Sequence, residues 1–230
     1  DALLVELPSN VGAPAAFNRG AASSDTAWTL RVDDDDHHPE DFASVLLREA
    51  HRHDAAVVAA PWVHRGDRSL AEALTRARSD RRCPAFGDHP STFPPDPGCF
   101  TPFMPGNMLA RTEVFRTVRF DESLNGNAWR EETDFYLRCA EDGYRTWLTP
   151  FTHSWIITPA AGGQRSRSRL SYECQTLRNN QRFLRRHRQV LGLTRRGAVI
   201  WASAAFELAR AQPIARSLAA RARRSRRRYG

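Results

Sequence analysis

The segment AWTLRVDDDDHHPED, residues 27–41, joins a strand-like stretch to four consecutive aspartates. Its first part, AWTLRV at 27–32, has the alternating pattern typical of a β-strand, and Pro39 is predicted to open a helix that runs to about His53. The aspartates therefore follow the carboxyl end of a strand, which is where ligands bind in open α/β sheets.

Two interpretations of these aspartates remain open. The first is an acidic turn before a helix, whose N-terminal dipole favours negative charge. One aspartate is enough for that purpose, and neighbouring carboxylates raise each other's pKa unless a positive group lies between them. The second interpretation is a cation site, because carboxylates at Asp-x-Asp spacing can hold Mg²⁺ or Mn²⁺.

Strand and helix patterns alternate on both sides of this segment. Further strands are predicted at 3–7, 55–63, 107–110, 145–149 and 153–157, and helices at 15–22, 69–79 (capped by Ser69), 112–115, 131–143, 168–188 and 197–211. In the helix at 168–188 the stripe expected to pack on the body is Leu170, Cys174, Leu177, Gln181 and Leu184. This alternation predicts an α/β fold with a mixed, mainly parallel sheet flanked by helices.

The charge is divided unevenly along the chain. Residues 1–164 carry 16 arginines against 24 acidic residues, whereas residues 165–230 carry 18 arginines against 2 glutamates. A hydrophobic content of 41% is enough for a core and excludes wholesale disorder. No apolar run is long enough to predict a membrane-spanning helix. The opening DALLVELPSN lacks the features of a signal peptide and an initiator Met, so we expect the natural N-terminus to lie upstream.

The four cysteines do not stand at the spacing of zinc ligands. Cys139 and Cys174 fall on helical patterns and are predicted to be small core residues. Cys83 and Cys99 both lie within the proline-rich loop at 80–105, bracket its middle part and either form a disulfide or remain reduced.

Two other segments carry polar residues in patterns that suit chemistry. In WREETDFYLRCAEDGYRTW, residues 129–147, three acids fall in the first turn of a helix: Glu131, Glu132 and Asp134. Compensation of the helix dipole explains them without a function, and a general base facing a cleft is the functional alternative. In SNVGAPAAFNRGAA, residues 9–22, a turn leads into a helix whose backbone N–H groups can approach an anion, although tight packing explains the pattern equally well.

The succession of these segments resembles the GT-A glycosyltransferases, in particular the large family of inverting, nucleotide-sugar-dependent enzymes. The resemblance covers about residues 3–190 and lies in the order N-x-G…N-x-G, strand plus D-x-D, long loop, PGNMLARTEVF, RFDE, REETDF…GYR and a strand carrying His153. It implies that residues 1–190 form a partial GT-A domain that lacks the first strand, helix and strand of the family. Residues 191–230 are then a basic helical extension.

The resemblance also implies roles for individual residues. The nucleotide-sugar site would contain Asn10, Gly12, Asn18, Asp33, Asp34, Gly106 and Asn107. Glu132 would be the catalytic base, with Glu131 and Asp134 beside it, and Asp35 and His153 would bind Mg²⁺ or Mn²⁺. Two positions depart from the family pattern: Glu132 stands where Asp is common, and Phe17 stands where many members have Arg.

The expected activity is therefore metal-dependent transfer of a sugar from a nucleotide diphosphate to an acceptor hydroxyl, with inversion. The acceptor would be a glycan or a lipid-linked molecule, and the protein would be cytoplasmic or peripheral at the inner membrane face. Two alternatives stay open: a nucleotidyltransferase-like enzyme, and a non-enzymatic module that binds membranes or nucleic acid through the arginine-rich residues 216–228. Of these partners, nucleic acid is the weaker expectation, because the tail lacks interleaved aromatic residues.

Overall fold

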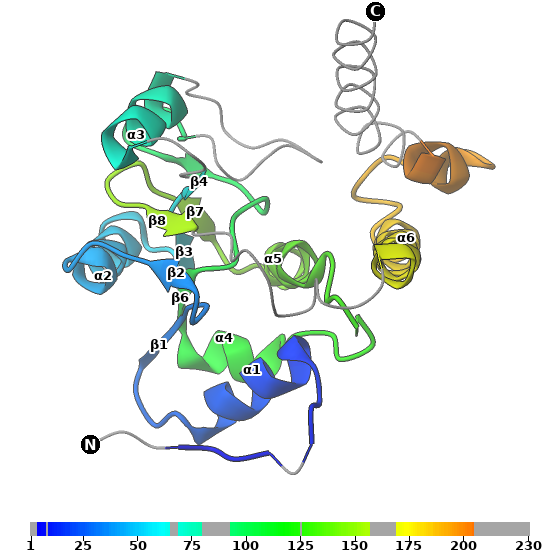
Figure 1. Ribbon diagram of the computed structural model, residues 1–230, viewed down its shortest axis with the longest axis horizontal. Helices are drawn as coiled ribbons and strands as arrows, with labels where there is room; N and C mark the ends of the chain where they lie inside the picture. Colours follow the sequence, from blue (N-terminus) through cyan, green and yellow to red (C-terminus); the bar gives the residue numbers. More distant parts are fainter. Residues whose placement is uncertain are drawn as a thin grey trace, which may run out of the picture.

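Two sheets form the framework of the chain in a computed structural model (Figure 1). The structure describes residues 4–7, 9–64, 69–79, 93–124, 126–156 and 169–204. The larger sheet has the order β1 (Trp28–Arg31), β6 (Met108–Arg111), β3 (Val57–Ala59), β7 (Thr146–Leu148) and β5 (Cys99–Phe100). The smaller sheet has the order β2 (Asp36–His37), β8 (Ser154–Ile156) and β4 (Trp62–His64).

Strand directions correct one part of the sequence prediction. The α/β class and the mixed sheet are confirmed, but only the pairs β3–β7 and β4–β8 are parallel among the described strands. The pairs β1–β6, β3–β6, β5–β7 and β2–β8 are antiparallel. The reason is that β6 enters between β1 and β3, which run in the same direction, and reverses its pairing with both. As a result, the start of β6 lies at the same sheet edge as the carboxyl ends of β1, β3 and β7.

The helices agree with the sequence patterns to within a few residues. They are α1 (Ala13–Ser23), α2 (Phe42–His53), α3 (Leu70–Ser79), α4 (Thr112–Thr117), α5 (Glu131–Glu141) and α6 (Arg169–Arg186). Residues 198–204 are helical as well, and the remainder of the helix predicted at 197–211, like the basic segment 216–228, lies outside the described residues. The predicted cap of α3 is confirmed: the N–H of Glu72 donates to Ser69 Oγ (3.3 Å), and the N–H of Ser69 donates to Glu72 Oε2 (3.1 Å).

Two strand predictions are wrong in detail. Residues 4–7 are not in a strand, and Leu4 is 79% exposed. The apolar run at 55–63 divides into β3 and β4, which belong to different sheets. The division falls at Pro61, which lacks the N–H that a continuous strand would use.

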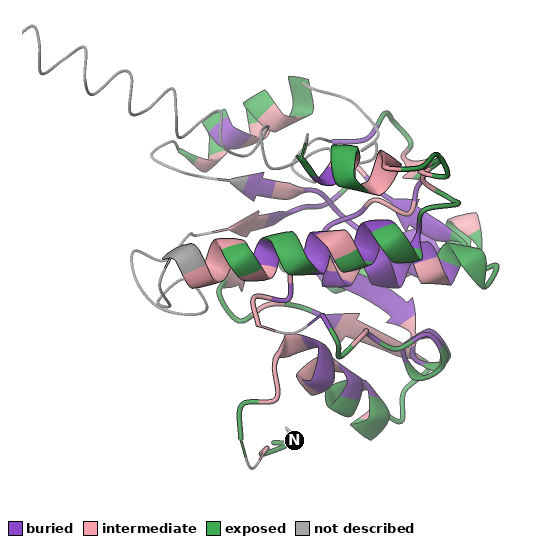
Figure 2. Cartoon of the chain, turned by 90° about the vertical axis from the view of Figure 1, so that its right-hand side faces the viewer, coloured by how far each residue is buried: buried purple, intermediate pink, exposed green. Residues whose placement is uncertain are grey.

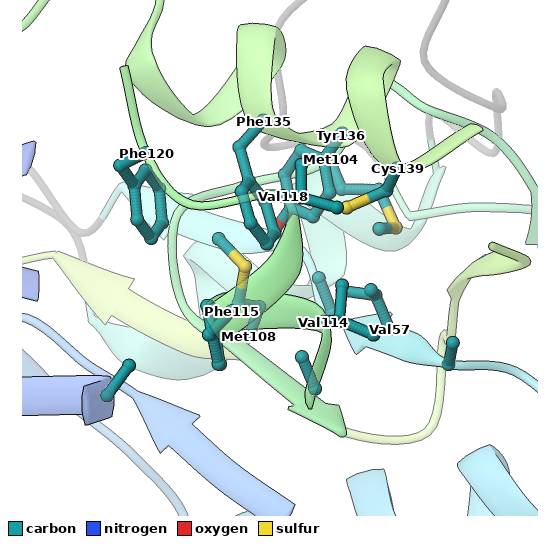
Figure 3. Close-up of a cluster of buried hydrophobic side chains, with 14 of the residues drawn as sticks. Val57, Met104, Met108, Val114, Phe115, Val118, Phe120, Phe135, Tyr136 and Cys139 are labelled. Carbon is teal, nitrogen blue, oxygen red and sulfur yellow. The ribbon is translucent and has the colours of Figure 1, made fainter. Parts of the chain in front are cut away.

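The core lies on both faces of the larger sheet. One cluster joins the sheet to α4 and α5 and includes Val57, Met108, Phe115, Phe135 and Tyr136 (Figure 3). The cluster on the other face joins the sheet to α2 through Phe42, Leu46 and Ala50. The first of these clusters holds α5 against the sheet, with the N-terminal turn of α5 toward the strand edge that carries the aspartates.

Helix α6 packs outside α5, but not through the predicted stripe. Cys174 is exposed and Leu177 is 37% exposed, whereas Leu184 is buried as expected. Figure 2 shows the alternation of buried and exposed residues along this helix. Its buried polar side chains are Thr176, Asn179 and Asn180, and His187 directly after the helix is also buried. Polar partners in the segment that leads into α5 explain this face, because Asn127 Nδ2 donates to Thr176 Oγ1 (2.6 Å) and Arg130 Nε donates to Asn180 Oδ1 (3.1 Å).

Among the cysteines, Cys139 is free and buried as predicted, and Cys99 is disulfide-bonded. Cys83, its partner in one of the two sequence interpretations, lies outside the described residues. None of the helices within the described ranges has both the length and the apolar character needed to cross a membrane.

Candidate functional site

The acidic turn after β1 meets the loop before β6. Arg31 at the end of β1 lies opposite Met108 at the start of β6. The residues that follow Arg31 therefore face the residues that precede Met108. The N–H of Asp33 donates to Asn107 Oδ1 (3.1 Å), and Asn107 Nδ2 donates to Asp36 Oδ2. Asn107 therefore holds the turn at two points. Asp33 and Asn107, which were predicted as site residues from distant segments, lie in contact.

Arg31 connects this turn to the first turn of α5. One guanidinium nitrogen lies 3.1 Å from Asp33 Oδ1 and 3.3 Å from Glu131 Oε1, and the other lies 3.8 Å from Glu132 Oε1. Its side chain is only 6% exposed. The guanidinium also lies over the ring of Phe17, 4.0 Å from the centroid. A single buried cation thus contacts three carboxylates.

Gly106 leaves the space in which this cluster closes. A Cβ at this position would lie 2.1 Å from an Arg31 terminal nitrogen and 2.7 Å from Glu132 Oε1. The hydroxyl of Tyr136 donates to the carbonyl of Pro105, which fixes the same loop on α5. Glycine is therefore required here for close approach of the backbone rather than for an unusual dihedral angle.

The surroundings raise the proton affinity of the carboxylates at this edge. Burial raises the pKa of Glu131 well above its usual range, and the charge of Glu132 adds to that effect while Arg31 opposes it. Burial also raises the pKa of Glu132, again against the attraction of Arg31. The pKa of Asp36 rises to about 6 because of burial and because of Asp33 and Asp35, although its bond to Asn107 works the other way.

Arg31 keeps its positive charge in this cluster. Burial by itself would lower the pKa of the guanidinium, but Glu132, Asp33 and Glu131 raise it above its ordinary value. Sequence reasoning did not select Arg31. The available signal was its position two residues before Asp33, which places both side chains on the same face of an extended segment.

The two glutamates differ in access to solvent. The side chain of Glu131 is 5% exposed and that of Glu132 is 23% exposed. Glu131 lies deeper and contacts Arg31 more closely. Glu132 is therefore the carboxylate of this pair that solvent reaches more easily.

Asp134 does not join this cluster, so the catalytic role predicted for it is replaced by an anchoring role. It accepts hydrogen bonds from Arg138 Nε (2.8 Å) and Arg186 (3.0 Å), and its Oδ1 lies 2.9 Å from His187 Nε2. Although burial would raise the pKa of Asp134, the bond to His187 and the charge of Arg138 lower it below the usual value. The cause of the misplacement is helical geometry, since a residue two positions after Glu132 projects from another side of α5.

The N-terminal candidates organise α1. Asn10 Oδ1 accepts the N–H of Gly12 (3.0 Å), and Gly12 has φ of 84° directly before the helix. Asn18 is buried: its Nδ2 donates to the Phe120 carbonyl and to Glu122 Oε1, and its Oδ1 accepts the Phe120 N–H. The amide of Asn18 is thus engaged in holding the segment at 120–122 against α1, close to the rings that surround Arg31.

The two predicted metal ligands, Asp35 and His153, differ in their exposure to solvent. Asp35 is exposed, as is Asp34, which was predicted for the nucleotide-sugar site, and His153 is 9% exposed with Nε2 lacking a hydrogen-bond partner. Pairing of His37 with Trp155 brings the acidic turn and the strand after His153 side by side. Burial, together with Arg78 and His38, lowers the pKa of His153 and favours the neutral imidazole that a metal needs.

No three His, Cys, Asp or Glu side chains form a preformed metal cluster in the part of the chain that the structure describes. A site with few protein ligands still suits Mg²⁺, which is commonly held by one or two carboxylates together with water and substrate phosphates. The exposed carboxylate of Asp35 is a donor of the kind that Mg²⁺ prefers, whereas the unpartnered nitrogen of His153 suits a transition metal better than Mg²⁺.

Comparison with known proteins gives one family and a set of similar folds. The family model described as "Glycosyl transferase family 2" matches residues 1–118. No curated protein matches the chain. Similar solved structures include S. aureus TarS 1–349, with 13% identity and a TM-score of 0.45, covering 79% of this chain and 53% of that one.

Two further structures of TarS 1–349 are similar to the same degree. The complex with UDP-GlcNAc has 13% identity and a TM-score of 0.45 and covers 74% of this chain and 51% of that one. The complex with UDP has the same identity and TM-score and covers 79% and 53%. The chain spans about half the length of these structures, and at this level of similarity they carry no argument about its activity. The family model, in contrast, covers just over half of the 230 residues and includes the acidic turn, Gly106 and Asn107, so the chain belongs to glycosyl transferase family 2.

Proposed function

We propose that this protein transfers a sugar from a nucleotide-diphosphate donor to an acceptor hydroxyl with inversion at the anomeric carbon. The observation that carries the proposal is the meeting of three segments at one sheet edge: the acidic turn, Gly106–Asn107 and the first turn of α5. Ligands of α/β sheets bind at such an edge. The proposal keeps residues 1–190 as the catalytic unit and residues 191–230 as a basic extension.

Glu132 acts as the general base. In a single displacement, the acceptor oxygen bonds to the anomeric carbon while the bond from that carbon to the diphosphate oxygen breaks. The hydroxyl proton passes to the carboxylate of Glu132 in the same step. A raised pKa suits this task, because a base is most effective when its pKa lies near the working pH.

Arg31 and Glu131 are positioning residues. Arg31 contacts Asp33 and both glutamates at the same time, which holds the three carboxylates near one another and offsets their mutual repulsion. Asn107 orients the acidic turn, so that Asp33 and Asp34 are available to the ribose and base of the donor. Asn10 and Gly12 shape the N-terminal side of the same region.

Asp35 and His153 would hold a divalent cation. When bound, such a cation supplies positive charge that stabilises the departing diphosphate. The acceptor class follows from the family resemblance alone and stays a glycan or lipid-linked molecule, used on the cytoplasmic side of a membrane.

The test measures release of nucleoside diphosphate by the full chain, with Mn²⁺ or Mg²⁺ and a panel of nucleotide sugars. UDP-GlcNAc is one member of this panel. Glu132→Gln should lower turnover by about 10²- to 10⁴-fold, the usual contribution of a general base. Glu113→Gln, which removes an exposed carboxylate on α4, is the matched control. Turnover that survives Glu132→Gln would exclude this residue as the base.

Metal dependence needs a separate measurement. Calorimetric titration of Mn²⁺ with UDP should show binding that is lost in Asp35→Asn and retained in Glu132→Gln. Manganese-dependent binding of the nucleotide that persists in Asp35→Asn would remove the metal assignment.

A further inference from the structure

The C-terminal part of the described chain carries a charged surface that the proposed reaction does not use. Residues 169–204 contain eight arginines and a single acidic residue, Glu173. Some of these arginines have internal partners: Arg186, for example, pairs with Asp121 (2.5 Å) and Asp134 (3.0 Å). Other arginines of this part face solvent.

Four exposed arginines surround a hollow of about 310 Å³ between the end of α6 and the helical stretch at 198–204. They are Arg185, Arg188, Arg195 and Arg196, and the lining also includes Thr194 and Ile200. Within the described ranges, no ion pair joins these four guanidinium groups to an acidic side chain. The planar guanidinium group matches the geometry of phosphate oxygens, so a hollow lined by several arginines suits a phosphate group.

An exposed apolar pair stands beside the hollow, with Ile200 in its lining and Trp201 next in the chain. Ile200 is 73% exposed and Trp201 is 77% exposed. This exposure does not come from an unattached helix, because Val199 and Ala202 pack on the cluster formed by Leu137, Phe183 and Leu184. Helical spacing then directs the two residues between these anchors away from the body, and Figure 1 places this stretch beyond α6 on the side away from the sheets.

We propose that this surface, defined here as the arginine–tryptophan patch (Arg185, Arg188, Arg195, Arg196, Ile200 and Trp201), attaches the protein to membranes that contain anionic phospholipids. Lipid phosphates would occupy the arginine-lined hollow, and Ile200 and Trp201 would enter the boundary between headgroups and acyl chains. Arginine near tryptophan is the combination expected at that boundary, where both charge and amphipathic rings are stabilised.

The charge and the apolar pair together favour lipid over other occupants. A soluble polyanion would account for the arginines but would leave Ile200 and Trp201 in water. An acidic phospholipid surface accounts for both, since it presents phosphate oxygens and hydrocarbon within one side-chain length. The proposal does not depend on glycosyl transfer, and its test measures no activity.

The test uses co-sedimentation of the full chain with vesicles of phosphatidylcholine alone or of phosphatidylcholine with one-third phosphatidylglycerol. Binding is expected only with the anionic vesicles and should weaken as salt is added. The double variant Arg188→Glu and Arg196→Glu should lower the partition into anionic vesicles by at least about tenfold. The matched control, Arg48→Glu and Arg52→Glu, reverses two exposed arginines on α2 and should retain most of the binding.

The apolar contribution is tested with brominated acyl chains, which quench tryptophan fluorescence on contact. Quenching should be largest for the unsubstituted chain and should fall in Trp201→Phe, while Phe151→Ala, an exposed aromatic site elsewhere, should leave it unchanged. All of these variants keep residues 205–230. Equal binding of the arginine double variant and the unsubstituted chain, or absence of binding to either vesicle, would overturn the proposal.

Discussion

The two sides of helix α5 carry carboxylates with opposite surroundings. On the side of the acidic turn, one guanidinium serves three carboxylates, and the pKa values of Glu131 and Glu132 are raised. On the other side, Asp134 has two arginines and a histidine, and its pKa is lowered. A carboxylate surrounded by cations is held for stability, whereas carboxylates that outnumber their cation retain affinity for a proton or another cation.

The largest expected effect belongs to the anchoring side. Asp134→Ala leaves Arg138, Arg186 and His187 without their shared partner and should lower the free energy of unfolding by about 3 to 5 kcal/mol. Urea denaturation measures the change, and Asp142→Ala, an exposed aspartate after the same helix, is the control. A loss as small as that of the control would mean that the comparison between the two sides is wrong.

The next effect concerns space in the site. Gly106→Ala brings a methyl group to 2.1 Å from Arg31 and 2.7 Å from Glu132, so both side chains must shift. A displacement of about 1 Å at a catalytic group can cost about 100-fold in rate, and we expect a loss of that size in diphosphate release. Gly20→Ala, where a Cβ would meet nothing within 4 Å, should keep normal turnover. Normal turnover in Gly106→Ala would place the reacting centre elsewhere.

Arg31 should determine the pH dependence of the reaction. The base works when deprotonated, so turnover falls as the pH decreases through the pKa of Glu132. Arg31 lowers that pKa against the effect of burial. Arg31→Met should therefore raise it and move the acidic limb of the kcat/KM profile upward by at least about one pH unit. Arg31→Lys, which keeps the charge, should restore much of the original profile, and an unshifted limb in Arg31→Met would contradict the assignment.

The smallest effect is a change in stability whose sign depends on pH. Burial raises the pKa of Glu131 in the folded state above its pKa in the unfolded chain. As the pH rises from the lower of these two pKa values through the higher one, ionisation of Glu131 therefore lowers the stability of the fold. The free energy of unfolding of Glu131→Gln, relative to that of the unsubstituted chain, should thus increase by about 1 kcal/mol on going from acidic to neutral solution. Asp134→Asn should change in the other direction, because a lowered pKa contributes stability that is lost only in acid. Parallel pH trends in the two variants would show that the two sides do not differ.

Much of the fold could be predicted from local pattern. The strand at Trp28–Arg31, the capping box of α3 and the helix beginning at Glu131 all depend on residues close together in the chain. The meeting of Asp33 with Asn107 was also expected, although only from the family resemblance. The direction of β6 was not, because strand direction depends on which strands become neighbours and not on their own composition.

Arg31, Asp134 and α6 show where local pattern failed. An arginine within a strand could equally have faced solvent, and a buried position became favourable only because carboxylates from α5 came within reach. Asp134 was grouped with Glu132 by proximity in sequence, yet two of its three partners, Arg186 and His187, lie at the end of α6 and directly after it. The face of α6 that packs is partly polar for the same reason, since Asn127 and Arg130 provide hydrogen bonds that an apolar stripe could not use.

The sequence by itself determined the elements and the residue types available for chemistry, because strand alternation, helix capping and turn residues act over a few positions. Only the tertiary structure decided which carboxylates share a cation and which hold helices together. That choice depends on burial and on charges contributed by distant segments, and these shift a proton equilibrium only after the chain has folded.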